Sequence, residues 1–149
     1  MRAVVQRVSQ ASCRVDGRIT GQIQKGLLVF LAAGPDDAQQ DMDYIVDKII
    51  HLRIFPDEQD KMNLDVRQID GAILLISQFT LYGDCRKGRR PDFSSAGRPD
   101  AAQALYEQTI AALQKKGIRV QTGVFAAMME IACVNDGPVT LLLDSRKSF

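Results

Sequence analysis

Polar residues that could do chemistry gather in three short segments of the chain. Segment 77–84, "SQFTLYGD", places a hydroxyl, an amide, an aromatic ring and a second hydroxyl directly after an apolar run. Segment 83–98, "GDCRKGRRPDFSSAGR", holds five Arg and Lys residues against two Asp residues. Segment 135–140, "NDGPVT", interrupts another apolar run with a glycine and a proline. Each segment has an ordinary structural explanation and a functional one.

The first segment predicts a site where a buried strand ends. Ser77, Gln78, Phe79 and Thr80 would then be presented to a ligand by a rigid element, together with free backbone N–H groups. The structural alternative is a strand end whose hydroxyls satisfy neighbouring backbone groups. No general base accompanies Thr80, and an unactivated hydroxyl is a poor nucleophile. We therefore expect Thr80 and its neighbours to position a reacting group rather than to attack it.

The second segment concentrates positive charge. Five cations against two carboxylates leave the loop with a charge of +3, whereas the whole chain carries +1. Such a run can be a solvated loop, or it can clamp phosphate, because the arginine fork matches phosphate oxygens. One aromatic residue, Phe93, is too little for stacking on a run of bases. The candidate phosphate contacts are Arg86, Lys87, Arg89 and Arg90.

The third segment has no nucleophile or base with an obvious partner. Its composition favours a β-turn between two strands, 124–134 and 139–143. However, Pro138 removes a ladder donor, and its peptide bond can be cis at low cost. Gly137 removes a side chain. Together the two residues could expose carbonyl oxygens at a fixed angle, and such a surface can recognise a ligand by its shape.

Histidine and cysteine offer little to a conventional hydrolase. The single histidine, His51, has no visible nucleophile to serve. Cys13, Cys85 and Cys133 are odd in number and lack C-x-x-C spacing, which argues against a disulfide framework and a zinc site. Cys13 and Cys133 are predicted to be small buried residues of strands. No cluster has metal-ligand spacing, so we expect neither a metal nor another cofactor.

Strands and two helices must position these segments. Strict alternation on both sides of Asp16-Gly17 predicts a β-hairpin. Two nearly continuous apolar runs, 26–33 and 72–77, predict central strands that are covered on both faces. The remaining expected elements are helices at 37–52 and 99–117 and strands at 2–8 and 118–122. This order favours a mixed α/β fold with a barrel-like sheet and two main helices, not a doubly wound fold.

Size and composition are those of an ordinary globular protein. The 149 residues favour one domain over 1–149, large enough to bury a core without disulfides. The chain is 46% hydrophobic and 25% charged, both ordinary fractions for a globular protein. The beginning of the sequence lacks the apolar core of a signal peptide, and no apolar run reaches membrane-spanning length. We therefore expect a cytoplasmic protein with no membrane partner.

Two of the segments carry a resemblance to a known family. "SQFTL" at 77–81 and "NDGPVT" at 135–140 resemble the two signature motifs of the D-aminoacyl-tRNA deacylase family, in the expected order and spacing. The resemblance extends over nearly the whole chain, and it includes "QRV" at 6–8, "GLLVFL", "RIF" at 53–55, "KMNL" at 61–64 and "DCRKGRRPDFS". Two separate motifs make this a specific match, whereas either alone would not be.

The resemblance implies a homodimer that hydrolyses the ester between a D-amino acid and the terminal ribose of tRNA. It implies a cis bond at Gly137–Pro138, which one subunit inserts into the pocket of the other. The carbonyl oxygens would face the substrate's α-amino group and leave no room for an L side chain, while glycine would not be excluded. Segment 77–80 would line the facing pocket, and either Thr80 or the neighbouring ribose hydroxyl would help to activate the attack.

The resemblance also suggests further pocket residues. Phe125 and Met129 fall in "FAAMME", where the family lines its pocket, and Arg7 matches a family arginine near it. Met128 stands where a polar residue is common, which leaves the local contacts open. The basic loop would contact the acceptor end of tRNA, an expectation that rests mainly on its charge. The alternative function is a non-catalytic RNA-binding module that uses the same loop.

Overall fold

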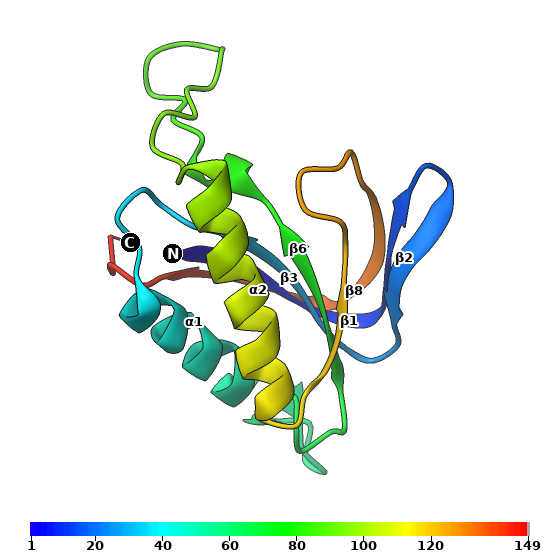
Figure 1. Ribbon diagram of the computed structural model, residues 1–149. Coiled ribbons are helices and arrows are strands. Elements are labelled where there is room, and N and C mark those ends of the chain that lie inside the picture. The colour runs from blue at the N-terminus through cyan, green and yellow to red at the C-terminus, as the bar shows by residue number, and fades with distance from the viewer. Residues whose placement is uncertain (149) are drawn as a thin grey trace.

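A computed structural model describes residues 1–148; residue 149, the last of the predicted domain, lies outside them. The helices are α1 (Gln39–His51) and α2 (Pro99–Lys115), and both lie on one side of a curved sheet (Figure 1). The strands are β1 (Arg2–Val15), β2 (Arg18–Ile23), β3 (Gly26–Ala32), β4 (Phe55–Pro56), β5 (Met62–Leu64), β6 (Ala72–Ser77), β7 (Arg119–Thr122) and β8 (Glu130–Asp144). A short 3-10 helix, η1 (Phe79–Tyr82), follows β6.

The main sheet mixes parallel and antiparallel pairs. Strands β3 and then β2 run along one side of β1, and β8 runs antiparallel along the other. Strands β3, β6 and β7 are parallel neighbours. Strand β7 curls back toward β2, where a Cβ on Gly21 would lie 2.5 Å from the Thr122 carbonyl oxygen. Glycine is therefore needed for this close approach, and the nearly closed, barrel-like sheet predicted from the sequence is confirmed.

The apolar runs of β3 and β6 are buried on both faces, as predicted. Alternate residues of each strand, such as Leu27 and Ile73, face the helices and join a large core with the apolar side of α1. The residues between them, such as Leu28 and Leu74, face the inside of the barrel. Because each face meets apolar partners, neither strand shows the alternation of a half-exposed strand.

The predicted turn at 135–140 is wrong, because the chain does not reverse there. Strand β8 continues through the segment, and both of its halves pair with β1. Asn135 lies opposite Val8 and Thr140 lies opposite Gln6, so four residues stand opposite Arg7 alone. The segment is thus a large β-bulge, and a bulge tolerates proline because the looped-out residue donates no ladder hydrogen bond.

Two smaller expectations also fail. The strand predicted over 124–134 begins only at Glu130, because residues 124–127 form a turn with Ala126 at a φ of 61°. Cys13 is buried as predicted, but Cys133 is exposed. Ala132, Cys133 and Val134 are all exposed, so neither face of this part of β8 is covered within residues 1–148. Within the same residues, no helix has both the length and the apolar character needed to cross a membrane.

Candidate active site

The 77–80 segment lies where β6 ends and η1 begins. The backbone N–H of Gln78 donates to the Leu31 carbonyl of β3 at 2.8 Å, which ties the segment to the sheet. Ser77 and Gln78 are half-buried, whereas Phe79 and Thr80 are exposed, Phe79 to 58%. The structure therefore brings these four predicted residues together at a strand end, on a surface open to a ligand.

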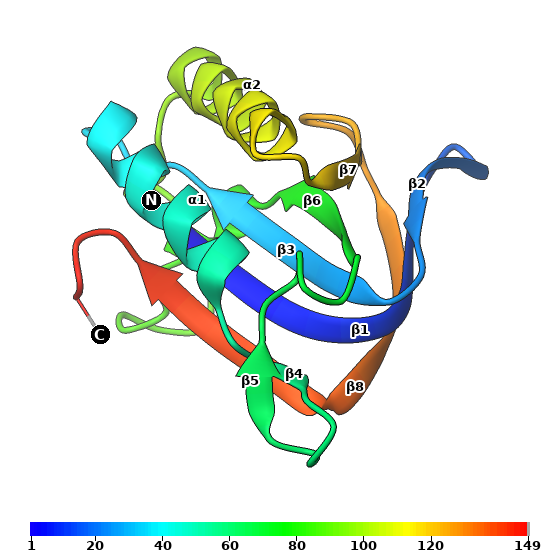
Figure 2. The ribbon, with the colours of Figure 1, turned by 90° about the horizontal axis from the view of Figure 1, so that it is seen from below.

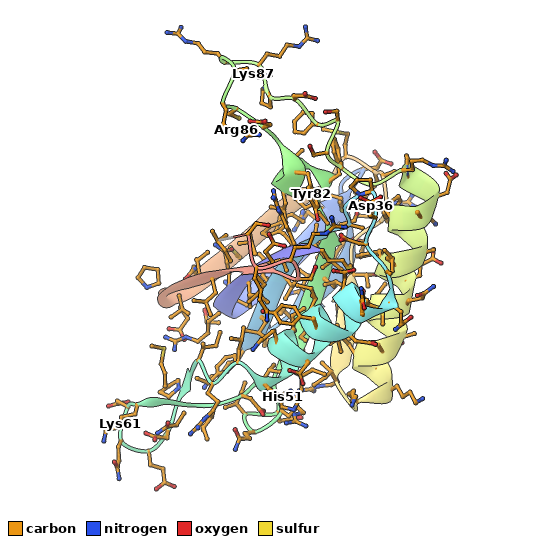
Figure 3. All side chains as sticks on the ribbon, turned by 90° about the vertical axis from the view of Figure 1, so that its left-hand side faces the viewer. Asp36, His51, Lys61, Tyr82, Arg86 and Lys87 are labelled. Carbon is orange, nitrogen blue, oxygen red and sulfur yellow. The ribbon has the colours of Figure 1, made fainter. Side chains whose placement is uncertain are left out.

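Thr80 lacks the partner that a nucleophile requires. The side-chain amide of Gln78 donates a hydrogen bond to the Thr80 hydroxyl. An amide nitrogen cannot accept a proton from that hydroxyl. The one histidine, His51, lies at the end of α1 and far from Tyr82, the last residue of η1 (Figure 3). Its Nδ1 is 2.9 Å from the Asp47 carbonyl oxygen. This geometry is consistent with a positioning role for Thr80.

The space beside the strand end is small and mostly apolar. A cavity of about 30 Å³ lies there, lined by Ser77, Gln78 and Phe79 from the motif and by Phe125 and Tyr106 from elsewhere in the chain. Tyr106 was missed by the sequence reasoning, since it belongs to the apolar face of α2 and its hydroxyl donates to the Leu75 carbonyl at 2.8 Å. A space of this size holds a water molecule but not an aminoacyl group.

The predicted pocket residues do not all meet at this cavity. Phe125 lines it and lies 5.9 Å from the Tyr106 ring, centroid to centroid. Met129 packs instead against the interior of the barrel, in the core that contains Leu74 and Ile76. Met128 projects into solvent and is 92% exposed.

The bulge of β8 is held from its two ends by side chains. The Arg7 Nε donates to the Asp136 carbonyl at 3.0 Å and lies 3.2 Å from the Asp136 carboxylate, and its Nη1 donates to the Ile54 carbonyl at 2.6 Å. The Asn135 side chain accepts the Val139 backbone N–H at 2.9 Å. Asn135 is a site residue that the sequence reasoning did not select, although Asn before a turn-like segment commonly binds nearby backbone.

Gly137 and Pro138 form the exposed tip of this bulge. The peptide bond between them is cis, and Gly137 has a φ of 132°. A Cβ on Gly137 would lie 2.8 Å from Val139 Cγ2 and 3.0 Å from Arg7 Nη2. Both the φ of Gly137 and the crowding therefore require glycine at this position. The tip presents main chain, with no reactive side chain.

The bulge and the 77–80 segment are well separated on the sheet, because the bulge stands beside the middle of β1 and the 77–80 segment follows the end of β6. The strand register places Ser77 beside Leu31 and Leu31 beside Ala3, whereas the bulge stands beside Arg7. Four residues of β1 separate these positions, which corresponds to ~13 Å along the strand. The two segments are also on different strands, with β1 and β3 between them. They do not form one pocket within a single protomer.

The basic loop forms a projecting arm, residues 84–92, at the same end as η1. Backbone hydrogen bonds between Asp84 and Asp92, at 2.7 and 3.0 Å, close its base. The edge of the Phe93 ring meets the Phe79 ring, with centroids 5.2 Å apart. Figure 3 shows Lys87 at the far end of the arm and Tyr82 near its base. The arm is therefore attached directly to the candidate site.

The cations of the arm are not equivalent. Two nitrogens of the Arg86 guanidinium donate to the Asp84 carboxylate: Nε donates to Oδ1 at 2.9 Å, and Nη2 donates to Oδ2 at 2.6 Å. The hydrogen bonds from Arg86 lower the pKa of Asp84 to about 2. Lys87, Arg89 and Arg90 are exposed, and no carboxylate of residues 1–148 pairs with them. Of the four predicted phosphate contacts, these three have cationic groups that are free to bind.

The donor sets for metal chemistry are sparse in the part of the chain that the structure describes. There, no three His, Cys, Asp or Glu side chains are grouped as a metal ion would need. Cys85 is exposed on the arm.

Comparison with known proteins assigns the family. The sequence model of the D-Tyr-tRNA(Tyr) deacylase family matches residues 4–144. The chain belongs to this deacylase family. Two deacylase relatives align over the full length of both chains: the D-aminoacyl-tRNA deacylases of Koribacter versatilis, 58% identical, and of Clostridioides difficile, 59% identical. The resemblance inferred from "SQFTL" and "NDGPVT" is thereby confirmed.

Solved structures match the deacylase fold closely. A structure titled "c-Myc DNA Unwinding Element Binding Protein" superimposes with a TM-score of 0.91 at 38% identity and covers 97% of this chain and 98% of its own. A structure titled as that of a probable eukaryotic D-amino acid tRNA deacylase has a TM-score of 0.82 at 20% identity, with 96% and 98% coverage. At 20% identity, the second structure supports only the similarity of fold.

Proposed function

We propose that this deacylase-family protein hydrolyses the ester bond of D-aminoacyl-tRNA and releases the free D-amino acid and tRNA. The carrying observation is that both motif segments reach the surface on backbone anchored by hydrogen bonds, within a chain that matches the family over residues 4–144. The full-length relatives named D-aminoacyl-tRNA deacylase support the same substrate.

Hydrolysis of this ester depends on the positioning of the reacting groups more than on an activated side chain. Water attacks the ester carbonyl, the bond from that carbon to the ribose oxygen breaks, and the ribose oxygen takes up a proton. An aminoacyl ester is labile, so orientation and backbone N–H donors near 77–80 can supply much of the rate. The hydrogen bond from Gln78 favours a positioning role for Thr80. The adjacent ribose 2′-hydroxyl is then the better candidate to assist the attacking water.

Selection against L-amino acids falls to the tip of the bulge. In this proposal the carbonyl oxygens of Gly137 and Pro138 face the α-amino group and leave no room for an L side chain. Support comes from the exposure of the tip and from the anchoring of its flanks by Arg7 and Asn135. A backbone that excludes only a side chain accepts glycine, so glycyl-tRNA is also a substrate in this proposal.

A second copy of the chain completes the site. Since the bulge and the 77–80 segment are separated on one protomer by ~13 Å along β1 and by two intervening strands, they can share a pocket only between the subunits of a homodimer. The small size of the cavity beside 77–80, about 30 Å³, agrees with a pocket that lacks one wall. Strand β8 also exposes Val134 to 49% and Leu142 to 62%. Exposed apolar residues of this kind fit a strand that packs against a partner.

The arm supplies the contact to the acceptor end of tRNA. Lys87, Arg89 and Arg90 are exposed cations on a projection that leaves the candidate site directly. The same observation favours one alternative, a non-catalytic RNA-binding module. Such a module would bind tRNA with a strong salt dependence and show no turnover.

A deacylation time course separates these functions. Matched D-aminoacyl-, L-aminoacyl- and glycyl-tRNA are incubated with the protein in excess EDTA. The proposal expects rapid loss of the D-aminoacyl and glycyl esters and survival of the L-aminoacyl ester. Equal rates on D and L substrates would refute chiral selection, and binding without hydrolysis of any ester would favour the RNA-binding module.

A further inference from the structure

The buried carboxylate of Asp37 contacts residues that are remote in sequence, and one of them is the last residue of η1. Asp37 follows β3, and its side chain is fully buried. One oxygen lies 2.7 Å from the Met1 amino group and accepts the Gly34 backbone N–H at 2.5 Å. The other lies 3.2 Å from Arg146 Nη2. A carboxylate that binds two cationic groups makes charge-assisted hydrogen bonds, so Asp37 is held firmly in the fold.

Tyr82 connects η1 to Asp37. It is the last residue of η1, and its hydroxyl donates to the Asp37 carboxylate at 3.2 Å. Burial, and next the charge of Asp37, raise the pKa of Tyr82, which keeps the hydroxyl protonated and able to donate. A Cβ on Gly34 would lie 2.8 Å from the Tyr82 oxygen, so the packing around the hydroxyl is tight.

Arg2 holds the same end of η1 from the other side. Its guanidinium lies 4.5 Å from the centre of the Tyr82 ring, which is a cation–π distance. Its Nη1 also donates to the Leu81 carbonyl at 3.1 Å, and its Nε lies 3.8 Å from the buried Asp144 carboxylate. The last two residues of η1 are therefore fixed by contacts to the ring, the hydroxyl and the backbone.

The front of η1 makes fewer contacts to the buried part of the fold than its end does. The helix has four residues, and none of them is fully buried. A 3-10 helix this short has poor hydrogen-bond geometry and is not stable in isolation. Its first end is tied to β3 through the Gln78 N–H, and Phe79 and Thr80 between the ends are exposed. Apart from the contact between the Phe79 and Phe93 rings and the bond from the Gln78 side chain to Thr80, their placement comes from the two ends.

We propose that Tyr82, held by Asp37 and Arg2, is a positioning residue that sets the orientation of Phe79 and Thr80 for the reaction. The inference rests on the proposed function, in which 77–80 lines the reacting pocket. It adds a tyrosine that touches no substrate and acts through the peptide segment it anchors. Misplacement of a reacting group by about 1 Å can cost ~100-fold in rate.

The test replaces the tyrosine in two steps. Tyr82→Phe keeps the ring beneath Arg2 and loses the bond to Asp37, whereas Tyr82→Ala loses both. Hydrogen exchange measured by mass spectrometry should rise over residues 77–83 in Tyr82→Phe and rise further in Tyr82→Ala. Exchange over the β1–β2 hairpin, 11–23, should stay unchanged. For D-aminoacyl-tRNA, kcat should fall about tenfold and ~100-fold respectively, with the Kd for tRNA within twofold.

Tyr44→Phe is the matched control. Tyr44 is a half-buried tyrosine on α1 that contacts Lys48, away from η1. Its replacement should change neither the exchange of 77–83 nor kcat. Asp37→Asn should reproduce the local exchange of Tyr82→Phe, and if it does not fold, Tyr82→Phe still decides the question.

The exchange data separate the failure of this inference from the failure of the proposed function. Unchanged exchange over 77–83 in Tyr82→Phe would overturn the positioning role, whatever the activity. An increase spread evenly over the whole chain would also overturn it, since that describes a general loss of stability. Increased exchange confined to 77–83, in a protein whose native form hydrolyses no D-aminoacyl-tRNA, would support the anchor and refute the function.

Discussion

The two motif segments of this protein are both held in place by contacts to the rest of the fold, but the contacts differ. Segment 77–80 extends from β6, a strand buried in the middle of the sheet, and its far end is fixed through Tyr82. Segment 135–140 is a bulge in β8, an outer strand, and it is fixed by Arg7 and Asn135. Figure 2 shows the two strands on different sides of β1 and β3. One segment is anchored to the core and presents reactive or polar side chains, while the other is anchored at an edge strand and presents a tip with no reactive side chain.

This difference fits the division of labour that we propose. Orientation of a labile ester needs groups whose positions do not fluctuate, and a buried strand end gives that stability. Exclusion of a side chain needs a surface that can enter another molecule, and an outer strand is free to do so. The comparison predicts that the two segments respond differently to mutation.

The largest effect is expected at the bulge. Gly137→Ala places a Cβ against Val139 and Arg7 and opposes a φ of 132°. Single-turnover deacylation of D-aminoacyl-tRNA should fall about 100-fold, while the Kd for tRNA stays within twofold. Gly17→Ala is the control, because Gly17 also has a positive φ, 74°, but no atom within 4 Å of the added carbon. If Gly137→Ala lost tRNA affinity and activity in parallel, the proposed separation of selection from binding would be wrong.

A mixing experiment tests whether the two segments meet between subunits. Gly137→Ala supplies an intact 77–80 segment, and a double variant, Gln78→Ala with Thr80→Ala, supplies an intact bulge. Random exchange between two C₂ dimers makes half of them mixed, and each mixed dimer has one intact site, so activity should reach about a quarter of the native value. The measurement is deacylation before and after subunit exchange. No gain, despite exchange shown by native mass spectrometry, would place both segments of a site in one subunit.

A smaller effect is expected at the arm. Arg89→Ala with Arg90→Ala removes two exposed cations, so the dependence of log K on log salt should flatten by roughly 1.5 and tRNA affinity should fall about tenfold near physiological salt. The ratio of D to L deacylation should not change. Lys115→Ala with Lys116→Ala removes the same charge from the other end of the molecule and serves as the control. A changed D/L ratio in the arm variant would mean that the arm shapes the pocket.

The smallest effect concerns the pH dependence of the pair between Asp84 and Arg86 at the base of the arm. The Arg86 hydrogen bonds lower the pKa of Asp84 to about 2, below its ordinary 3.8. A depressed folded-state pKa contributes stability above pH 3.8 that is lost as the pH falls through 2. Exchange of the Asp84 and Asp92 amides, corrected for intrinsic rates, should therefore not change between pH 5 and pH 8. Loosening of the arm near pH 5 would show that the pair with Arg86 does not persist in solution.

Much of the architecture was predictable because it follows from local patterns. The hairpin at Asp16-Gly17 was confirmed because both residues adopt the positive φ that such a turn requires. The helices were confirmed within a few residues of their predicted ends. The pair between Arg86 and Asp84 joins residues two positions apart, yet the charge count alone treated all the cations as equal.

The errors came from features that depend on distant partners. Composition makes Asn135 to Thr140 a turn, and only the pairing of both flanks with β1 makes it a bulge. Cys133 stands in an apolar strand pattern, but no neighbouring element of residues 1–148 covers it. The role of Asn135 as an anchor was likewise visible only when its bond to Val139 was seen.

By itself, the sequence determined the main helices and strands, the two buried strands, the concentration of charge at 83–98 and the membership of the deacylase family. The tertiary structure decided which segments face one another: that Arg7 reaches the bulge, that Tyr82 reaches Asp37, and that two strands separate the two motifs. The physical reason is the distance along the chain over which each kind of interaction acts. Periodicity and turn chemistry act over a few residues, whereas strand register and side-chain anchors join distant ones, such as Arg7 and Asp136, which are 129 positions apart in the chain.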